Sequence, residues 1–191
     1  MNPLDLHFVL GGARSGKSAY AERLASEARQ PVTYIATACV GDDEFAARVA
    51  LHRARRPADW ALVEAPLDLA QALTHADGPK RVILIDCLTL WLANLLCPPD
   101  SEAPQAGWQA ALDGFVDALQ HARAQVLIVS NEIGLGVVPM GKVTRLYVDE
   151  LGRLNQRVAA LCPAVTLIVA GIAMVVKAPA PPFPADLYRH N

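Results

Sequence analysis

The segment that most constrains the fold of this chain is a glycine-rich stretch at residues 11–18, which reads Gly-Gly-Ala-Arg-Ser-Gly-Lys-Ser. This order matches G-x-x-x-x-G-K-[ST], the phosphate-binding loop that joins a strand to a helix. A short apolar run at 6–10 precedes it, and a helical pattern at 17–28 follows it. Backbone N–H groups and a helix N-terminus would then converge on a phosphate. An ordinary glycine-rich turn is the alternative, but such a turn needs neither Lys17 nor Ser18.

Apolar runs and helical patterns alternate along the rest of the chain. We expect strands at 6–10, 32–36, 82–85, 126–129, 165–169 and 172–176, and helices at 17–28, 42–57, 108–122 and 148–161. Continuous apolar strands are typical of a parallel sheet covered on both faces. Ala170 and Gly171 between the last two strands predict a hairpin. The sequence therefore predicts an α/β fold, a P-loop (RecA-like) three-layer arrangement whose mostly parallel sheet has an antiparallel C-terminal edge strand.

Length and composition narrow the classes of protein. We expect 191 residues to form a single nucleotide-binding catalytic domain over 1–177, followed by a proline-rich C-terminal tail over 178–191. A net charge of -2 gives no electrostatic footprint for nucleic acid. No apolar run approaches the roughly 20 residues of a membrane span, and the N-terminus has no signal-like segment. We therefore expect a cytoplasmic protein with no nucleic-acid partner and no membrane span.

The four cysteines, at positions 39, 87, 97 and 162, lack the paired spacing of a metal site. We expect them to be reduced and mostly structural.

A carboxylate for a metal ion is expected at Asp86, which directly follows the apolar run at 82–85. P-loop enzymes hold Mg²⁺ with such a carboxylate, directly or through water, together with the hydroxyl of the loop, here Ser18. The alternative is a turn residue or helix cap after a strand. Asn131 follows another strand, so it should lie at the same edge of the sheet as Asp86.

A histidine stands within a charged segment at 42–57, which begins with acidic residues and ends with basic ones, the polarity that a helix dipole favours. Arg48, His52 and Arg56 fall on one side of this expected helix. Neighbouring guanidinium groups would keep His52 neutral and available as a nucleophile, and they could also bind a phosphate tail. A solvated charge run with an incidental histidine explains the same pattern, and the residues alone leave the choice open.

The motifs taken together resemble a known family. They are Gly11 to Ser18, Tyr34-Ile35-Ala36-Thr37, Asp43-Glu44, His52, Arg56-Pro57, Ser130-Asn131-Glu132, Gly134, Gly136, Pro139 and Asn155-Gln156. In this order and spacing they are similar to the bifunctional adenosylcobinamide kinase and adenosylcobinamide-phosphate guanylyltransferase family. The resemblance extends to about Lys177.

This resemblance implies a two-step enzyme of adenosylcobalamin synthesis that works as a homotrimer with Mg²⁺. Adenosylcobinamide is first phosphorylated from ATP or GTP, and GMP then passes from GTP through a guanylated histidine to adenosylcobinamide phosphate. His52 matches the histidine, and Lys17 is the second expected catalytic residue. The implied nucleotide contacts are Gly11, Gly12, Ala13, Arg14, Ser15, Gly16, Lys17, Ser18, Ala36, Thr37, Ala38, Arg53, Ala54, Arg55, Arg56, Glu64 and Asp86, with Ser18 and Asp86 at the metal.

One departure and three alternatives accompany the resemblance. Leu51 precedes His52 where certain relatives have a second histidine, so any helper role of that histidine is absent. The alternatives are a P-loop kinase of one small molecule, an enzyme with the guanylyltransferase activity alone, and a nucleotide-dependent regulatory ATPase. The residues do not separate the kinase activity from the transferase activity, because both need the phosphate loop.

Overall fold

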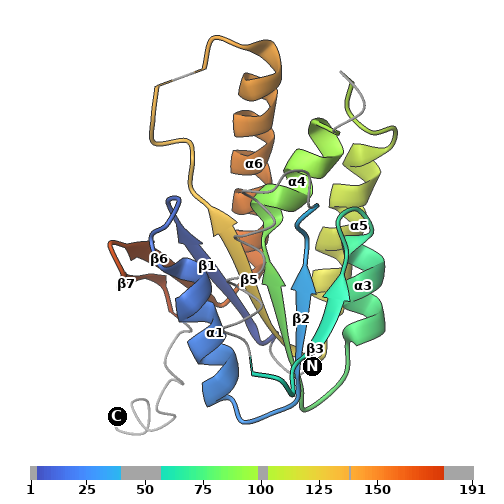
Figure 1. The fold of residues 1–191 in the computed structure, drawn as a ribbon, viewed down its shortest axis with the longest axis vertical. Coiled ribbons are helices and arrows are strands. Elements are labelled where there is room, and N and C mark those ends of the chain that lie inside the picture. Colours follow the sequence, from blue (N-terminus) through green and yellow to red (C-terminus); the bar gives the residue numbers. More distant parts are fainter. Residues whose placement is uncertain (1–3, 40–56, 99–102, 138, 179–191) are drawn as a thin grey trace, which may run out of the picture.

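The computed structural model describes residues 4–39, 57–98, 103–137 and 139–178, and it contains one sheet of seven strands in the order β3-β2-β4-β5-β1-β6-β7 (Figure 1). The strands are β1 Leu6–Gly11, β2 Val32–Ala36, β3 Ala61–Glu64, β4 Val82–Asp86, β5 Gln125–Asn131, β6 Ala164–Val169 and β7 Ile172–Lys177. The helices are α1 Lys17–Glu27, α3 Leu69–Ala76, α4 Leu88–Leu96, α5 Trp108–Gln120 and α6 Lys142–Leu161. Neighbouring strands are parallel except β6 and β7, which form the predicted antiparallel edge. The predicted fold class is confirmed.

Several elements differ from the sequence-based expectation. β3, α3 and α4 were not predicted, and α6 begins at Lys142 rather than at Val148. The first turns of α6 contain no fully buried side chain, although Leu146 and Tyr147 pack partly buried against the core. The helix expected at 42–57 and all of the expected tail except Ala178 lie outside the described residues.

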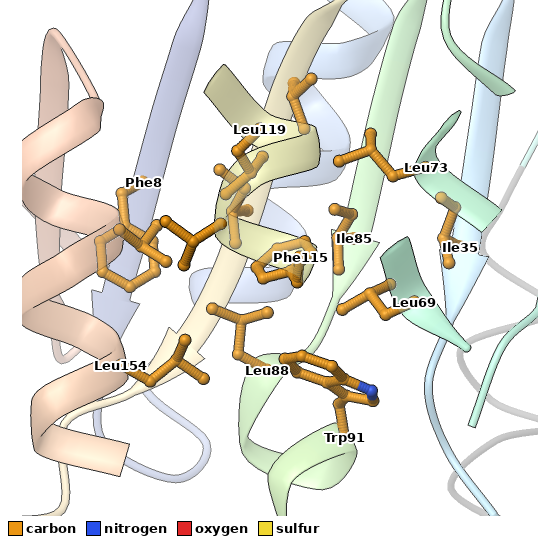
Figure 2. Close-up of a cluster of buried hydrophobic side chains, with 14 of the residues drawn as sticks. Phe8, Ile35, Leu69, Leu73, Ile85, Leu88, Trp91, Phe115, Leu119 and Leu154 are labelled. Atoms are coloured by element: carbon orange, nitrogen blue, oxygen red, sulfur yellow. The ribbon is translucent and has the colours of Figure 1, made fainter. Parts of the chain in front are cut away.

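Helices cover the sheet on both faces and give three layers (Figure 1). Among the described helices, α1 packs on one face over β1, β4 and β5, and we call this the α1 face. The other four helices pack on the opposite face and bury the larger apolar cluster, which includes Phe8, Ile85, Trp91 and Phe115 (Figure 2). The rings of Trp91 and Phe115 meet edge to face with centroids 5.1 Å apart. Each such buried side chain contributes roughly 1.5–3 kcal/mol to folding.

The carboxyl ends of the parallel strands form the edge on which the phosphate loop lies. β5 separates β1, which leads into the loop, from β4, which ends at Asp86. Side chains alternate between the faces of a strand, so Asp86 belongs with Leu84 on the α1 face. The loop and Asp86 therefore lie at the same edge and on the same face of the sheet, although they follow two strands that are not neighbours. Within the described ranges, no helix is long and apolar enough to cross a membrane.

Candidate active site

The phosphate-binding segment forms a tight connection between β1 and α1. β1 ends at Gly11, and α1 begins at Lys17. Gly16, just before the helix, has φ 99°, a left-handed conformation that favours glycine. A Cβ on Gly11 would lie 2.5 Å from the Ser15 hydroxyl oxygen and 2.7 Å from the Ile168 carbonyl oxygen. The geometry of the turn therefore requires both glycines.

The loop rests on the turn between β6 and β7. The N–H of Gly171 in this turn donates to the Ser15 carbonyl at 2.8 Å, and the N–H of Ser15 donates to the Gly12 carbonyl at 3.3 Å. A Cβ on Gly16 would lie 3.5 Å from the Cα of Gly171, so the two main chains approach closely. A segment late in the sequence thus supports the shape of a loop near the N-terminus.

Lys17 is a buried cation at the base of the loop. Its side chain is only 9% exposed, and Nζ donates to the Gly12 carbonyl at 3.1 Å. Burial lowers the pKa of Lys17, and the negative charge of Asp86 opposes this shift. Charge-assisted hydrogen bonds are stronger than neutral ones, so phosphate oxygens are better partners for this ammonium group than the single carbonyl. Lys17 is therefore placed to bind phosphate.

Asp86 lies on the same face of the sheet, half-buried at the end of β4. The Tyr34 hydroxyl donates to Asp86 Oδ2 at 3.1 Å, which holds the carboxylate in place. Ser18, half-buried in the first turn of α1, brings a hydroxyl to the loop side. A carboxylate and a hydroxyl are hard oxygen donors of the kind Mg²⁺ uses beside substrate phosphates. The donor set fits the expected ion.

A buried hydrogen-bond network, which the sequence did not reveal, joins β2 to β4 and α4. The Thr37 hydroxyl donates to the Cys87 carbonyl at 2.7 Å and accepts from the Cys87 N–H at 2.8 Å. The Asn94 side-chain nitrogen donates to the Thr37 carbonyl at 2.8 Å and to the Pro66 carbonyl at 3.0 Å. The N–H of Thr37 donates to the Asp86 carbonyl. The network fixes the main chain next to Asp86 and the segments that follow β2 and β3.

Comparison with known proteins agrees with this geometry. The family model described as cobinamide kinase / cobinamide phosphate guanyltransferase matches residues 7–176. The chain belongs to this family. The bifunctional adenosylcobalamin biosynthesis protein CobP of Pseudomonas aeruginosa is 50% identical over 169 residues, which cover 88% of this chain and 95% of that protein. CobU of Escherichia coli, described in the same words, is 41% identical over 179 residues, covering 88% and 98%.

Among solved structures, the RadB recombinase aligns with 86% of this chain and 74% of its own, at 16% identity and a TM-score of 0.49.

The structure brings only some of the expected site residues together. Residues 11–18 and Asp86 share one neighbourhood, since the charge of Asp86 acts on Lys17. Ala36 is the register partner of both Asp86 and Glu64, so Glu64 lies two strands away, exposed on the edge strand β3. His52 and Arg53, Ala54, Arg55 and Arg56 lie outside the described residues.

Thr37 and Ala38 follow β2 at the same edge of the sheet. The hydrogen bonds of Thr37 to Asp86, Cys87 and Asn94 already engage its N–H, hydroxyl and carbonyl groups. Contact of residues 36–38 with nucleotide stays a prediction.

Proposed function

We propose that this chain phosphorylates the hydroxyl of adenosylcobinamide from ATP or GTP and then transfers GMP from GTP to adenosylcobinamide phosphate, giving adenosylcobinamide-GDP. The observation that carries the proposal is the buried Lys17 in a phosphate loop beside Asp86, in a chain that matches the cobinamide kinase family over residues 7–176. An enzyme that uses both nucleotides would work in the cytoplasm.

In the kinase reaction, the substrate hydroxyl attacks the γ-phosphorus, the bond to the nucleoside diphosphate breaks, and the hydroxyl proton is released. Such reactions depend on positioning and on stabilising negative charge. The loop N–H groups and Lys17 supply donors that are fixed before the phosphates arrive. Preorganised donors of this kind are effective because they need little rearrangement during the reaction.

Ser18 and Asp86 would hold Mg²⁺ next to the nucleotide. The ion would neutralise phosphate charge as the reaction proceeds. The Tyr34 hydroxyl, which donates to one oxygen of Asp86, would orient the carboxylate toward the site. This second contact is the kind of outer support that metal-binding carboxylates commonly have.

For guanylyl transfer we propose His52 as the nucleophile. A ring nitrogen attacks the α-phosphorus of GTP, an N–P bond forms, and pyrophosphate leaves. The phosphate of adenosylcobinamide phosphate then attacks the same phosphorus, the N–P bond breaks, and a phosphoanhydride forms. Family membership and the neighbouring Arg53, Arg55 and Arg56 support the assignment, because guanidinium groups bind phosphates well.

The test is incubation with α-labelled GTP and Mg²⁺, followed by mapping of the labelled residue. We expect an acid-labile, alkali-stable label on His52. His52→Ala should abolish labelling and guanylyl transfer while phosphorylation of adenosylcobinamide continues. His121→Ala, at the exposed histidine that caps the C-terminal end of α5, is the matched control and should label like wild type. Kinase activity without any label in wild type would favour the kinase of one small molecule.

We also propose that copies of the chain assemble, as a homotrimer, through β7. All six residues of this edge strand are exposed, including Ile172 at 68% and Val175 at 73%. An apolar edge strand with no further strand beside it in the described part of the chain is a ready site for association. Light scattering should give the mass of three chains, and Val175→Lys should lower it. An unchanged mass for the variant would move the interface elsewhere.

A further inference from the structure

The end of β5 carries a polar side chain to which neither reaction above gives a role. Asn131 is the last residue of β5, the strand between β1 and β4. Its register partner is Gly11, the first residue of the phosphate loop. The next N–H along the chain, that of Glu132, donates to the Gly11 carbonyl at 3.2 Å. Asn131 therefore lies directly beside the start of the loop.

The main chain of Asn131 is held from the opposite face of the sheet. Its N–H donates to the Thr89 hydroxyl of α4 at 2.8 Å, and its carbonyl accepts from the Asn155 side-chain nitrogen of α6 at 3.0 Å. The Tyr147 hydroxyl donates to the Thr89 carbonyl at 3.0 Å. These bonds fix Asn131, which extends past the last residue of the neighbouring strand β4.

The side chain of Asn131 belongs to the α1 face. Leu127 and Val129, four and two residues earlier on β5, are both buried in the α1-face cluster. Because strand side chains alternate, Asn131 shares their face, as Asp86 shares the face of Leu84 on β4. Asn131 thus lies on the side of the sheet where α1 begins with the phosphate loop.

In this position the side-chain oxygen of Asn131 has no partner. Oδ1 is buried and makes no hydrogen bond in the part of the chain that the structure describes. A buried acceptor without a donor costs free energy, and such groups in native proteins call for an explanation. An oxygen fixed beside a phosphate loop needs a donor, which the bare loop does not provide.

We propose that Asn131 Oδ1 accepts a hydrogen bond from an O–H group of the loaded active site, beside the transferred phosphate. Two groups there present an O–H: the alcohol of the cobinamide substrate and a water held next to the nucleotide. A neutral amide is too weak a base to take the proton, so Asn131 orients the donor. The proposal rests on the nucleotide site proposed above.

The test compares Asn131→Ala with Ser130→Ala in the full-length enzyme. Ser130 is the matched control, because its buried Oγ is also unpartnered but belongs, with Ile128, to the opposite face. We expect Asn131→Ala to lower kcat/KM for phosphorylation about tenfold, the effect of one hydrogen bond. We expect Ser130→Ala to keep the wild-type value.

Two further measurements separate the alternatives. The melting temperature without nucleotide should not fall in Asn131→Ala, since the lost oxygen has no partner in the empty site. A raised KM for cobinamide would identify the substrate alcohol as the donor, and a raised Mg²⁺ requirement would identify the water. An active wild type with unchanged kinetics in Asn131→Ala, or a lower melting temperature of that variant, would overturn the proposal. An inactive wild type would instead overturn the proposed function.

Discussion

The two faces of the sheet bury apolar clusters of different size. On the opposite face, four helices pack over a large cluster of aliphatic and aromatic side chains such as Phe8 and Phe115. The α1 face has a smaller cluster, which includes Tyr34 and Cys87 and lies beside Lys17. Buried polar groups carry more of the chemistry there, and apolar packing carries more of the stability on the other side.

This difference indicates that one face of the sheet contributes mainly to stability and the other mainly to activity. The core of the opposite face can be altered with loss of folding free energy, while the residues of the α1 face near the loop can be altered with loss of activity and little loss of stability. The five predictions below test that separation, from the largest expected effect to the smallest.

Phe115→Ala should lower the free energy of unfolding by about 3–5 kcal/mol, because the fully buried ring leaves a cavity next to Trp91. Denaturant titration measures the change. The activity per folded molecule should stay close to wild type. A well-folded variant with a large loss of activity would show that the opposite face also shapes the active site.

Lys17→Ala should reduce both activities by about 10²-fold or more, since one preorganised charge on the phosphates is lost. The melting temperature should stay the same or rise, because the buried ammonium is desolvated and, among the described residues, Nζ donates to the Gly12 carbonyl rather than to a carboxylate. Steady-state kinetics and thermal unfolding test the pair of effects. Lys142→Ala, at an exposed lysine of α6, is the control. Near-normal rates in a folded Lys17→Ala protein would contradict the assignment of the site.

Asp86→Asn should raise the Mg²⁺ concentration needed for half-maximal activity by about tenfold, since a charge-assisted contact is worth about 1.5–3 kcal/mol. Magnesium titration of both reactions measures this. The fold should survive, because the amide keeps nearly the volume of the carboxylate. An unchanged titration would assign Asp86 a structural role.

Asp77→Asn is the matched control for Asp86→Asn, at a carboxylate away from the loop. Burial alone would raise the pKa of Asp77, but hydrogen bonds from Ala124, Arg123 and Gly78 hold it below its ordinary value. A depressed folded pKa stabilises the fold at neutral pH, and this contribution disappears as the pH falls through it. Asp77→Asn should therefore cost about 1–3 kcal/mol at pH 7 and less under acid, with the Mg²⁺ requirement unchanged.

Thiol labelling at pH 8 should modify Cys39 and Cys97 quickly and spare Cys87 and Cys162, which are buried. Burial raises the pKa of Cys87 to about 11 and that of Cys162 to about 12, so little reactive thiolate forms in the fold. Two of the four cysteines are buried, and the mostly structural role expected of them stays a prediction. Mass spectrometry after short labelling gives the sites. Fast modification of Cys87 would mean that the α1 face opens readily.

The sequence predicted the elements with strong local signals. The phosphate loop, the bounds of β2 and the hairpin of β6 and β7 follow from glycine placement and continuous apolar runs. β3 escaped prediction because its apolar run is short and its residues are mostly exposed on an outer strand. α4 has an almost continuous apolar sequence, which does not distinguish a buried helix from a strand.

The active site was predictable where it follows a motif and unpredictable where it depends on distant contacts. Lys17 and Asp86 come from the loop pattern and from the end of an apolar strand. The bonds of Asn94 to Thr37 and Pro66 join residues far apart in sequence, and no periodicity marks them. The same holds for the unpartnered oxygen of Asn131, which only the packed structure reveals.

The support of the phosphate loop by Gly171 has a consequence for the order of folding. β1 is synthesised first, but its neighbours β5 and β6 come much later, and His7 of β1 contacts Thr166 across 159 positions. Contacts this distant form slowly, because the chain between them must first be closed into a loop. Gly171, whose N–H donates to the Ser15 carbonyl, lies near the end of the chain. Nearly the whole chain must therefore be synthesised before this hydrogen bond can form. A nucleotide that needs the supported loop would therefore stabilise the chain late in folding, after the C-terminal hairpin closes beside the first strand.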